Sequence, residues 1–298
     1  PLHAKAAVFD LDGQRLAIVA LDVIAITQAY TDRIRAGAQR LGFAPETVMV
    51  HALQNHSAPS VGGLMLDPDF PLDRSPELEY LDGTSTPYAI RVADAAIAAI
   101  ADAARQLVPV RAAAGRAVRD DLAFNRRAVC RDGSIRMPWV YSAREQPLGP
   151  TDICYMEGPA DPEIGVWAAR TDSLQIPLCL LHFTCHPVNL FATDHHAISA
   201  EWPGAWSDAL RARCGPAMLP LVLNGCCGNV NPWPPFTPDF RPDHRRQGAE
   251  LAASADKVLR QLAFADVTRL DSRTLRIELD DRDINPARAA EVDRILTE

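Results

Sequence analysis

The chain has 298 residues, of which 48% are hydrophobic and 23% charged, a size that fits one large α/β domain or two smaller ones. Its formal net charge of −8 argues against a nucleic-acid partner, because such proteins usually carry a concentrated basic face. No apolar run reaches the roughly 18 residues that suggest a membrane-spanning helix, so the sequence predicts no transmembrane segment.

Strand-like and helix-like patterns alternate along the chain. In chain order they predict strands at 4–9 and 16–21, a helix at 27–41, a strand at 48–53, a helix at 87–107, strands at 108–118, 122–127, 165–170 and 176–184, a helix at 203–213, a strand at 218–223, a helix at 243–262, a strand at 267–279 and a helix at 286–297. The turn signal Asp10-Leu11-Asp12-Gly13 joins the first two strands into a hairpin, and residues 138–162 read as irregular. We therefore expect an α/β fold with a mixed β-sheet core flanked by helices, in a single domain spanning 1–298.

Three loops that follow predicted strands concentrate polar and turn-forming residues. They cover 54–63, 186–201 and 224–235. Because functional sites of α/β proteins gather where strands release their loops, we hypothesise that the three loops meet at one pocket.

Histidines in two of these loops are candidate metal ligands. His56 and His186 each follow an apolar strand, a common position for a zinc ligand, although a buried structural histidine is the alternative interpretation. His195 and His196 form a denser cluster that is either loop surface or a source of a further ligand. The seven cysteines show no CxxC pair, which fits neither a disulfide framework nor a thiolate metal site.

Three charged residues could serve a reaction centre or the fold. Asp22 ends a buried strand, and Glu201 precedes a helix that it could either cap or serve from as a catalytic group. Arg126 could hold an oxyanion or a carboxylate through its planar guanidinium, or be solvated beside its neighbouring arginine. The motifs HExxH, GxSxG, the Walker loop and a helix-opening GxGxxG are all absent from the sequence.

Seven ordered sequence blocks resemble the neutral/alkaline non-lysosomal ceramidases. They are Leu16-Ala-Ile-Val-Ala-Leu-Asp22, Asn55-His56-Ser57-Ala58-Pro59, Asn125-Arg126-Arg127, Asp161-Pro-Glu-Ile-Gly-Val166, Cys185-His186-Pro187, Ile198-Ser-Ala-Glu-Trp-Pro-Gly204 and Gly228-Asn-Val-Asn-Pro232, and they cover almost the whole chain. The resemblance implies the fold of the N-terminal catalytic domain of that family, in a divergent, bacterial-type member. It also implies that the two ends of the family's chain are missing or truncated here.

The same resemblance implies a chemistry. In that family a catalytic zinc activates water for attack on an amide carbonyl, as in the hydrolysis of ceramide to sphingosine and a fatty acid. His186 matches the family's zinc-ligating histidine before a proline, and Arg126 matches its active-site arginine. A lipid-like or other small-molecule substrate is therefore expected, and secretion or a periplasmic location is favoured by the family, although this chain begins with no signal peptide.

The chain departs from the family pattern at three places. Where the family reads His-Thr-His-Ser-Gly-Pro, Gln54 holds the first position and His56 the second, so either His56 takes over the metal or the metal is altered or absent. Asn231 replaces the serine of the family's Gly-Asp-Val-Ser-Pro loop and could donate a hydrogen bond instead. The family's glutamate and tyrosine ligands lie on a later segment with no evident counterpart before Glu298.

Three hypotheses follow. The first is a hydrolase of amide or ester bonds that uses zinc or another divalent metal ion. Its predicted metal ligands are His56, His186, Asp22 and His195, its catalytic residues Arg126, Glu201 and Asn231, and its substrate-binding residues Gln54 and Asn229. The second is a ligand-binding homologue that has lost catalysis, and the third is a structural domain in which the histidines only satisfy hydrogen bonds.

Overall fold

The computed structural model of the protein describes residues 1–64, 78, 81–138, 152–237, 239–275, 277–278 and 285–297. Its larger strands form two sheets, one of three strands in the order β1-β2-β3 and one of four in the order β11-β10-β9-β4. Each sheet mixes parallel and antiparallel pairs, since β2 runs parallel to β3 and β10 parallel to β11 while the other pairs are antiparallel. The expected mixed α/β architecture is confirmed, with its strands divided between two sheets.

The first sheet is covered on one face by two helices. It comprises β1 (Ala4–Leu11), β2 (Gln14–Leu21) and β3 (Val48–Ala52), and it packs on α1 (Gln28–Gln39) and α2 (Thr86–Arg105), with the short helix η1 (Pro45–Thr47) leading into β3. The predicted hairpin is confirmed: β1 and β2 pair in register from Ala4 opposite Leu21. Its turn places Asp12 and Gly13 at φ values of 52° and 85°, a conformation that glycine adopts without strain.

The second sheet is covered by two other helices. It comprises β4 (Arg111–Val118), β9 (Glu163–Arg170), β10 (Leu178–Phe183) and β11 (Leu219–Asn224), and it packs on α4 (Glu201–Cys214) and α5 (His244–Leu259). Trp202 and Trp206 of α4 are fully buried in this core. Burial of two large indoles removes a large apolar area from water and fixes α4 against the sheet.

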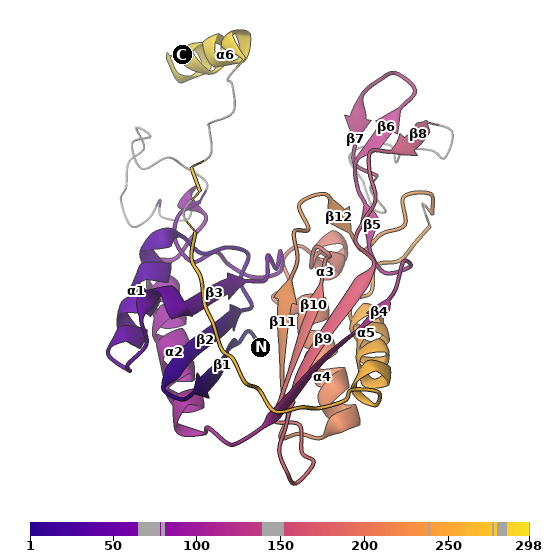
Figure 1. Ribbon diagram of the computed structural model, residues 1–298. Helices are drawn as coiled ribbons and strands as arrows, with labels where there is room; N and C mark the ends of the chain where they lie inside the picture. The colour runs from indigo at the N-terminus through magenta and orange to yellow at the C-terminus, as the bar shows by residue number, and fades with distance from the viewer. Residues whose placement is uncertain are drawn as a thin grey trace.

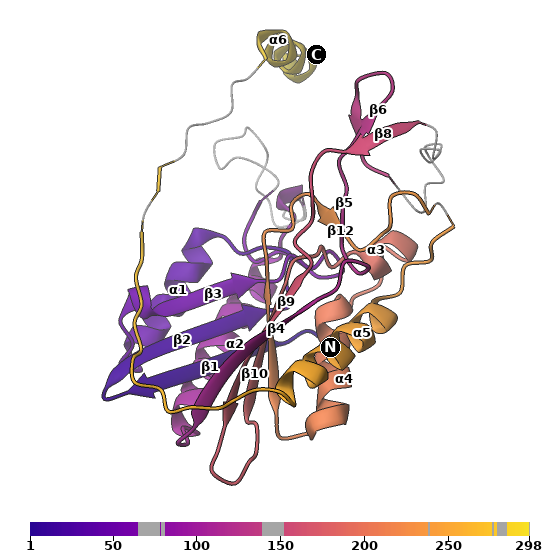
Figure 2. The same ribbon diagram turned by 45° about the vertical axis from the view of Figure 1, so that its right-hand side comes forward.

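The uncovered faces of the two sheets meet. Ala7 and Ala20 of the first sheet pack on Leu221 of the second, and the rings of Phe9 and Trp167 lie edge to face with centroids 5.4 Å apart. The order of layers is therefore helices, sheet, sheet, helices, and Figures 1 and 2 show α1 and α2 on one side and α4 and α5 on the other. β3, β10 and β11 all end at the same side of the molecule.

Smaller elements lie beyond these layers. They are β5 (Phe124–Asn125) paired with β12 (Val230–Asn231), a three-stranded arm of β6 (Ala128–Cys130), β7 (Ile135–Arg136) and β8 (Ile153–Met156), and the helices α3 (Asn189–Thr193) and α6 (Pro286–Thr297). The arm projects beyond the end of the second sheet in Figure 1. No helix in the described ranges has the length and apolar character needed to cross a bilayer.

Two sequence expectations are wrong. The interval 138–162 was expected to be irregular, yet β8 forms there because its residues pair with β6. The predicted strand at 267–279 is not formed among its described residues, which have no regular secondary structure. Only Ala265, just before it, bridges to Ala112, and the hydroxyls of Ser272 and Thr274 donate to the Glu46 carbonyl.

Candidate functional site

The three polar loops converge, as the sequence predicted. The backbone N–H of His56 donates to the Pro187 carbonyl at 3.2 Å, and the N–H of His186 donates to the Val230 carbonyl at 3.1 Å. The N–H of Ser199 donates to the Ser57 carbonyl at 3.0 Å. Main-chain hydrogen bonds therefore join the loops after β3, β10 and β11 into one surface, which fixes the histidines on them relative to each other.

The buried Asn55 and the half-buried Asn224 hold these loops in place. The Asn55 side chain donates to the Ser199 carbonyl at 2.6 Å and accepts from the Ser57 N–H at 2.9 Å. At the end of β11, Asn224 donates through Nδ2 to the Leu53 carbonyl and accepts from the Cys185 N–H. Asn55 thereby links its own loop to Ser199, and Asn224 links the end of β11 to Leu53 and Cys185, which makes the loop positions interdependent.

The imidazoles of His56 and His186 lie together at this surface, with ring centroids 5.3 Å apart. Nδ1 of His186 is 3.1 Å from the Val230 carbonyl oxygen, which can only accept, so Nδ1 carries the proton and Nε2 is the unprotonated nitrogen of the neutral ring. Burial, followed by the neighbouring His186, lowers the pKa of His56 to about 4, and burial also lowers the pKa of His186. Both rings are therefore neutral at pH 7.

Arg126 directly follows β5, and its charge acts on both imidazoles. Its backbone N–H donates to the Asn229 carbonyl at 2.8 Å, and its Nη1 donates to the Asn231 side-chain oxygen at 3.4 Å. Its positive charge contributes to the lowered pKa of both His56 and His186, which places the guanidinium close to the pair. The structure thus brings together a permanent cation and two neutral bases.

Gln54 is engaged by a cysteine that sequence reasoning missed. The buried Cys227 thiol donates to the Gln54 side-chain oxygen at 2.9 Å and accepts from Nδ2 of Asn224 at 3.4 Å. Burial raises the pKa of Cys227, so the thiol is protonated at neutral pH. In the sequence, only the position of Cys227 in the third polar loop pointed to a role at this site, because its contact with Gln54 joins residues far apart in the chain.

Glu201 is almost completely buried at the start of α4. Its carboxylate accepts from the Leu190 N–H and, at 3.2 Å, from the Trp202 N–H, and its own φ is 52°. Burial raises the pKa of Glu201 to about 7, against the opposing effect of the backbone N–H groups. These contacts join α3 to α4, and its predicted catalytic role stays a prediction.

The remaining predicted ligands make other contacts, and Phe191, whose ring centroid is 5.6 Å from that of His56, connects His56 with His195. The Asp22 carboxylate accepts from the His3 N–H at 2.9 Å, with the His3 ring 3.5 Å away. The exposed His195 ring contacts His196 and Phe191, with centroid distances of 4.3 and 6.4 Å. Of the four predicted metal ligands, the described contacts directly unite only the two paired imidazoles.

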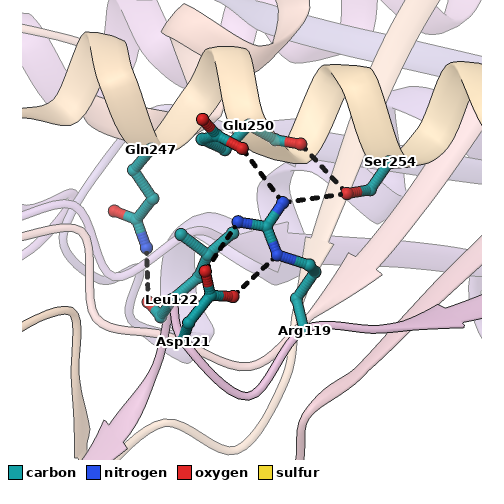
Figure 3. A network of polar contacts seen from close by, with 6 residues as sticks. All are labelled: Arg119, Asp121, Leu122, Gln247, Glu250 and Ser254. Atoms are coloured by element: carbon teal, nitrogen blue, oxygen red, sulfur yellow. Dashed lines mark hydrogen bonds and ion pairs between the residues drawn. The ribbon is translucent and has the colours of Figure 1, made fainter.

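Residues of helix α5 form hydrogen bonds with the chain segment that leads to β5. Gln247 donates to the Leu122 carbonyl at 3.1 Å and accepts from Nδ2 of Asn189 at 2.6 Å, so it links the chain before Arg126 to the start of α3. Beside it, Arg119 makes two bonds to Asp121 and a third to Glu250 of α5 at 3.1 Å (Figure 3). These contacts fix the approach of β5 to the histidines.

The two neutral imidazoles are chemically of the type that ligates zinc. A neutral imidazole whose Nδ1–H is held by a carbonyl presents Nε2 to a metal ion, the usual arrangement around zinc-ligating histidines. A catalytic zinc takes three protein ligands, and the part of the chain that the structure describes contains no group of three or more His, Cys, Asp or Glu side chains placed to hold a metal. The described residues therefore place together two imidazoles of the kind that ligate zinc, without a third such side chain beside them.

Comparisons with known proteins give structural neighbours only. No family model matches the sequence, and neither does any curated protein. A ceramidase solved in complex with C2 aligns with a TM-score of 0.64 at 20% identity, covering 87% of this chain and 38% of its own. The neutral ceramidase of Pseudomonas aeruginosa aligns at 0.62 and 20% identity, covering 84% of this chain and 37% of its own. The protein spans less than two fifths of the length of these two neighbours, and over most of its own length it has the fold of the neutral ceramidases.

Proposed function

We propose that the protein is a hydrolase of amide or ester bonds that acts on a lipid-like or other small-molecule substrate. The observation that carries the proposal is the pair of neutral imidazoles, His56 and His186, beside the Arg126 guanidinium. The ceramidase fold and the seven sequence blocks support the same class of reaction.

The side chains provide the groups that such a reaction needs. Where no metal ion is bound to it, the neutral His56 imidazole can accept the proton of an attacking water molecule, because burial keeps it unprotonated at neutral pH. The guanidinium can donate hydrogen bonds to the oxyanion that develops on the carbonyl. The side-chain oxygen of Asn231 orients the guanidinium by accepting a hydrogen bond from its Nη1. In this proposal Gln54 and Asn229 contact the substrate as it approaches the imidazoles.

A metal ion belongs to the proposal as its cofactor, with His56 and His186 as two of its ligands. When bound, zinc or another divalent ion would polarise the substrate carbonyl and lower the pKa of a bound water molecule. The neutral state of both imidazoles supports this role, because a protonated imidazole cannot ligate a metal. Glu201, fixed on backbone N–H groups, is proposed to position the loop between α3 and α4.

The test compares the parent protein with His186→Ala and with His182→Ala. His182 is an exposed histidine on β10, the strand that precedes His186, and it serves as the matched control. After dialysis and reloading with zinc, metal content per chain, zinc affinity and turnover of N-acyl lipids, simple amides and esters are measured. We expect about one zinc per chain and turnover in the parent and the control, and loss of both in His186→Ala. A zinc-loaded parent that hydrolyses none of these substrates would exclude the hydrolase.

A ligand-binding homologue without catalysis is the second candidate. It is favoured by the hydrogen bond that engages Gln54 with Cys227 and by the replacement of a family serine with Asn231. This candidate predicts that N-acyl lipids bind while no amide or ester is cleaved. Turnover that disappears in His186→Ala would end it.

A further inference from the structure

The chain has only two lysines, and one of them is half-buried. Lys5, on β1 at the edge of the first sheet, donates from Nζ to the hydroxyl of Ser207 on α4 at 2.6 Å. Ser207 is itself buried, and its hydroxyl lies 3.5 Å from the Pro220 carbonyl at the edge of the second sheet. The Lys5 ammonium therefore sits where both sheets and α4 meet. Lys257, the other lysine, is exposed on α5.

A cavity of about 1170 Å³ opens at this position. It lies between β1, α2, α4 and β11; neither His56 nor His186 lines it, whereas Ser199 and Glu201 at the start of α4 do. The volume exceeds the range of about 300–1000 Å³ that is usual for small-molecule sites, and it can admit an elongated molecule. Much of its wall is apolar, including Ala7, Phe9, Ala103, Leu178 and Leu219.

The charge of Lys5 is incompletely compensated. Burial is the largest influence and lowers the pKa of Lys5, while Asp22 and Asp208 oppose the change and Arg211 adds to it. Among the described residues no carboxylate forms an ion pair with Nζ, and an ammonium group has three N–H donors, of which Ser207 receives one. An anion placed in the cavity would accept hydrogen bonds from the remaining N–H donors and favour the charged form of the lysine.

We propose that the cavity binds a molecule with an apolar body and a single carboxylate, and that the carboxylate accepts hydrogen bonds from Nζ of Lys5. The apolar walls receive the body, since their burial on binding is favourable. Lys5 and Ser207 receive the carboxylate, because a charge-assisted hydrogen bond in a partly buried site is stronger than a neutral one. The assignment of the carboxylate to Lys5 and Ser207 does not rest on the hydrolase proposed above, although Glu201 belongs to the lining of the cavity.

The experiment measures calorimetric binding of decanoate and of decanol, which share a chain length and differ in the head group. The proteins are the parent, Lys5→Met, which keeps an unbranched stem, and Lys257→Met as the matched control. We expect the parent to bind decanoate more tightly than decanol. Lys5→Met should lower the affinity for decanoate about tenfold or more and leave the affinity for decanol unchanged. Lys257→Met should bind both molecules as the parent does. Equal affinity for both molecules, no decanoate binding, or parent-like binding by Lys5→Met would overturn the proposal.

A second measurement needs no variant. The two lysines of the parent are acetylated with limiting reagent, with and without decanoate, and each is quantified by mass spectrometry. Bound decanoate is expected to slow the acetylation of Lys5 several-fold and leave Lys257 unaffected. Equal rates for Lys5 with and without saturating decanoate would contradict the assigned site, even if Lys5→Met fails to fold.

Discussion

Two residues of the candidate site have backbone conformations that non-glycine residues rarely adopt. Gln54 and Glu201 have φ values of 59° and 52°. Such conformations cost of order 1–3 kcal/mol and persist only where neighbouring contacts enforce them. Here the enforcing contacts are the Cys227 bond to Gln54 and the backbone N–H groups bound to the Glu201 carboxylate. The strain therefore coincides with the loops that carry the histidines.

The first prediction concerns two adjacent arginines. Arg126→Ala removes the donor proposed for the oxyanion, and turnover should fall about 100- to 1000-fold, the usual loss for one such donor. Arg127→Ala is the matched control, because Arg127 is exposed and pairs with Glu157. Steady-state kinetics on an amide or ester substrate distinguish the two. Equal losses for both variants would contradict the assigned role.

The second prediction is a pH dependence that arises at His51. Its Nε2 accepts from the Asn224 N–H at 2.9 Å, and burial, followed by His182, lowers the pKa of His51 from 6.5 to about 4. Between these values the unfolded chain binds more protons than the folded one, so His51 makes stability fall as pH drops from about 6.5 to about 4. Urea unfolding across this range should give a shallower slope for His51→Gln than for the parent. An unchanged slope would show that His51 is already protonated in the folded state.

At the scale of elements, the close contact of α4 with α5 depends on a missing side chain. A Cβ added at Gly248 of α5 would lie 2.5 Å from the backbone nitrogen of Trp206 and 2.6 Å from the carbonyl carbon of Ala205. These are backbone atoms of α4, so they can move only with the helix. The same two helices hold Glu201 and Gln247, which makes their separation important for the site.

The third prediction is therefore that Gly248→Ala destabilises the protein by about 1–3 kcal/mol, the usual cost of overpacking. The sign is informative, because alanine in a helix is otherwise favoured over glycine by about 1 kcal/mol. Gly228→Ala is the control, since no atom lies within 4 Å of a Cβ built there. Chemical denaturation of both variants measures the change. A stabilised Gly248→Ala would mean that α4 and α5 separate at little cost.

At the scale of the whole molecule, two helix-covered sheets are joined by a small apolar cluster. Leu221 of β11 is fully buried there against Ala7 and Ala20 of the first sheet. The loops of the candidate site come from both sheets, His56 from the first and His186 from the second. Sheet-on-sheet packing therefore decides how far apart the two imidazoles lie.

The fourth prediction tests this junction. Leu221→Ala should lower the free energy of unfolding by about 2–5 kcal/mol, the range for a buried leucine whose cavity cannot collapse. Leu174→Ala, at a position 71% exposed, should change it by less than about 0.5 kcal/mol. Denaturation followed by circular dichroism provides the comparison. Parent-like stability of Leu221→Ala would show that the two sheets are held by other contacts.

The sequence alone determined most of the regular elements. Local periodicity and turn signals predicted the hairpin at its turn of Asp12 and Gly13, the helices from α1 to α6 apart from the short α3, and the strands that precede the three polar loops. It also predicted that these loops meet, because loops released at one end of a sheet lie close together. It failed at 267–279, where a strand-like pattern finds no partner strand among its described residues.

Tertiary structure decided which side chains face each other. The contact of Cys227 with Gln54 and that of Lys5 with Ser207 join residues far apart in the chain, and they form only when two sheets and a helix pack. The lowered pKa of His56 likewise results from burial, which no local pattern specifies. Periodicity reports which face of an element is apolar, whereas the partner of each polar group is set by the order of strands and layers.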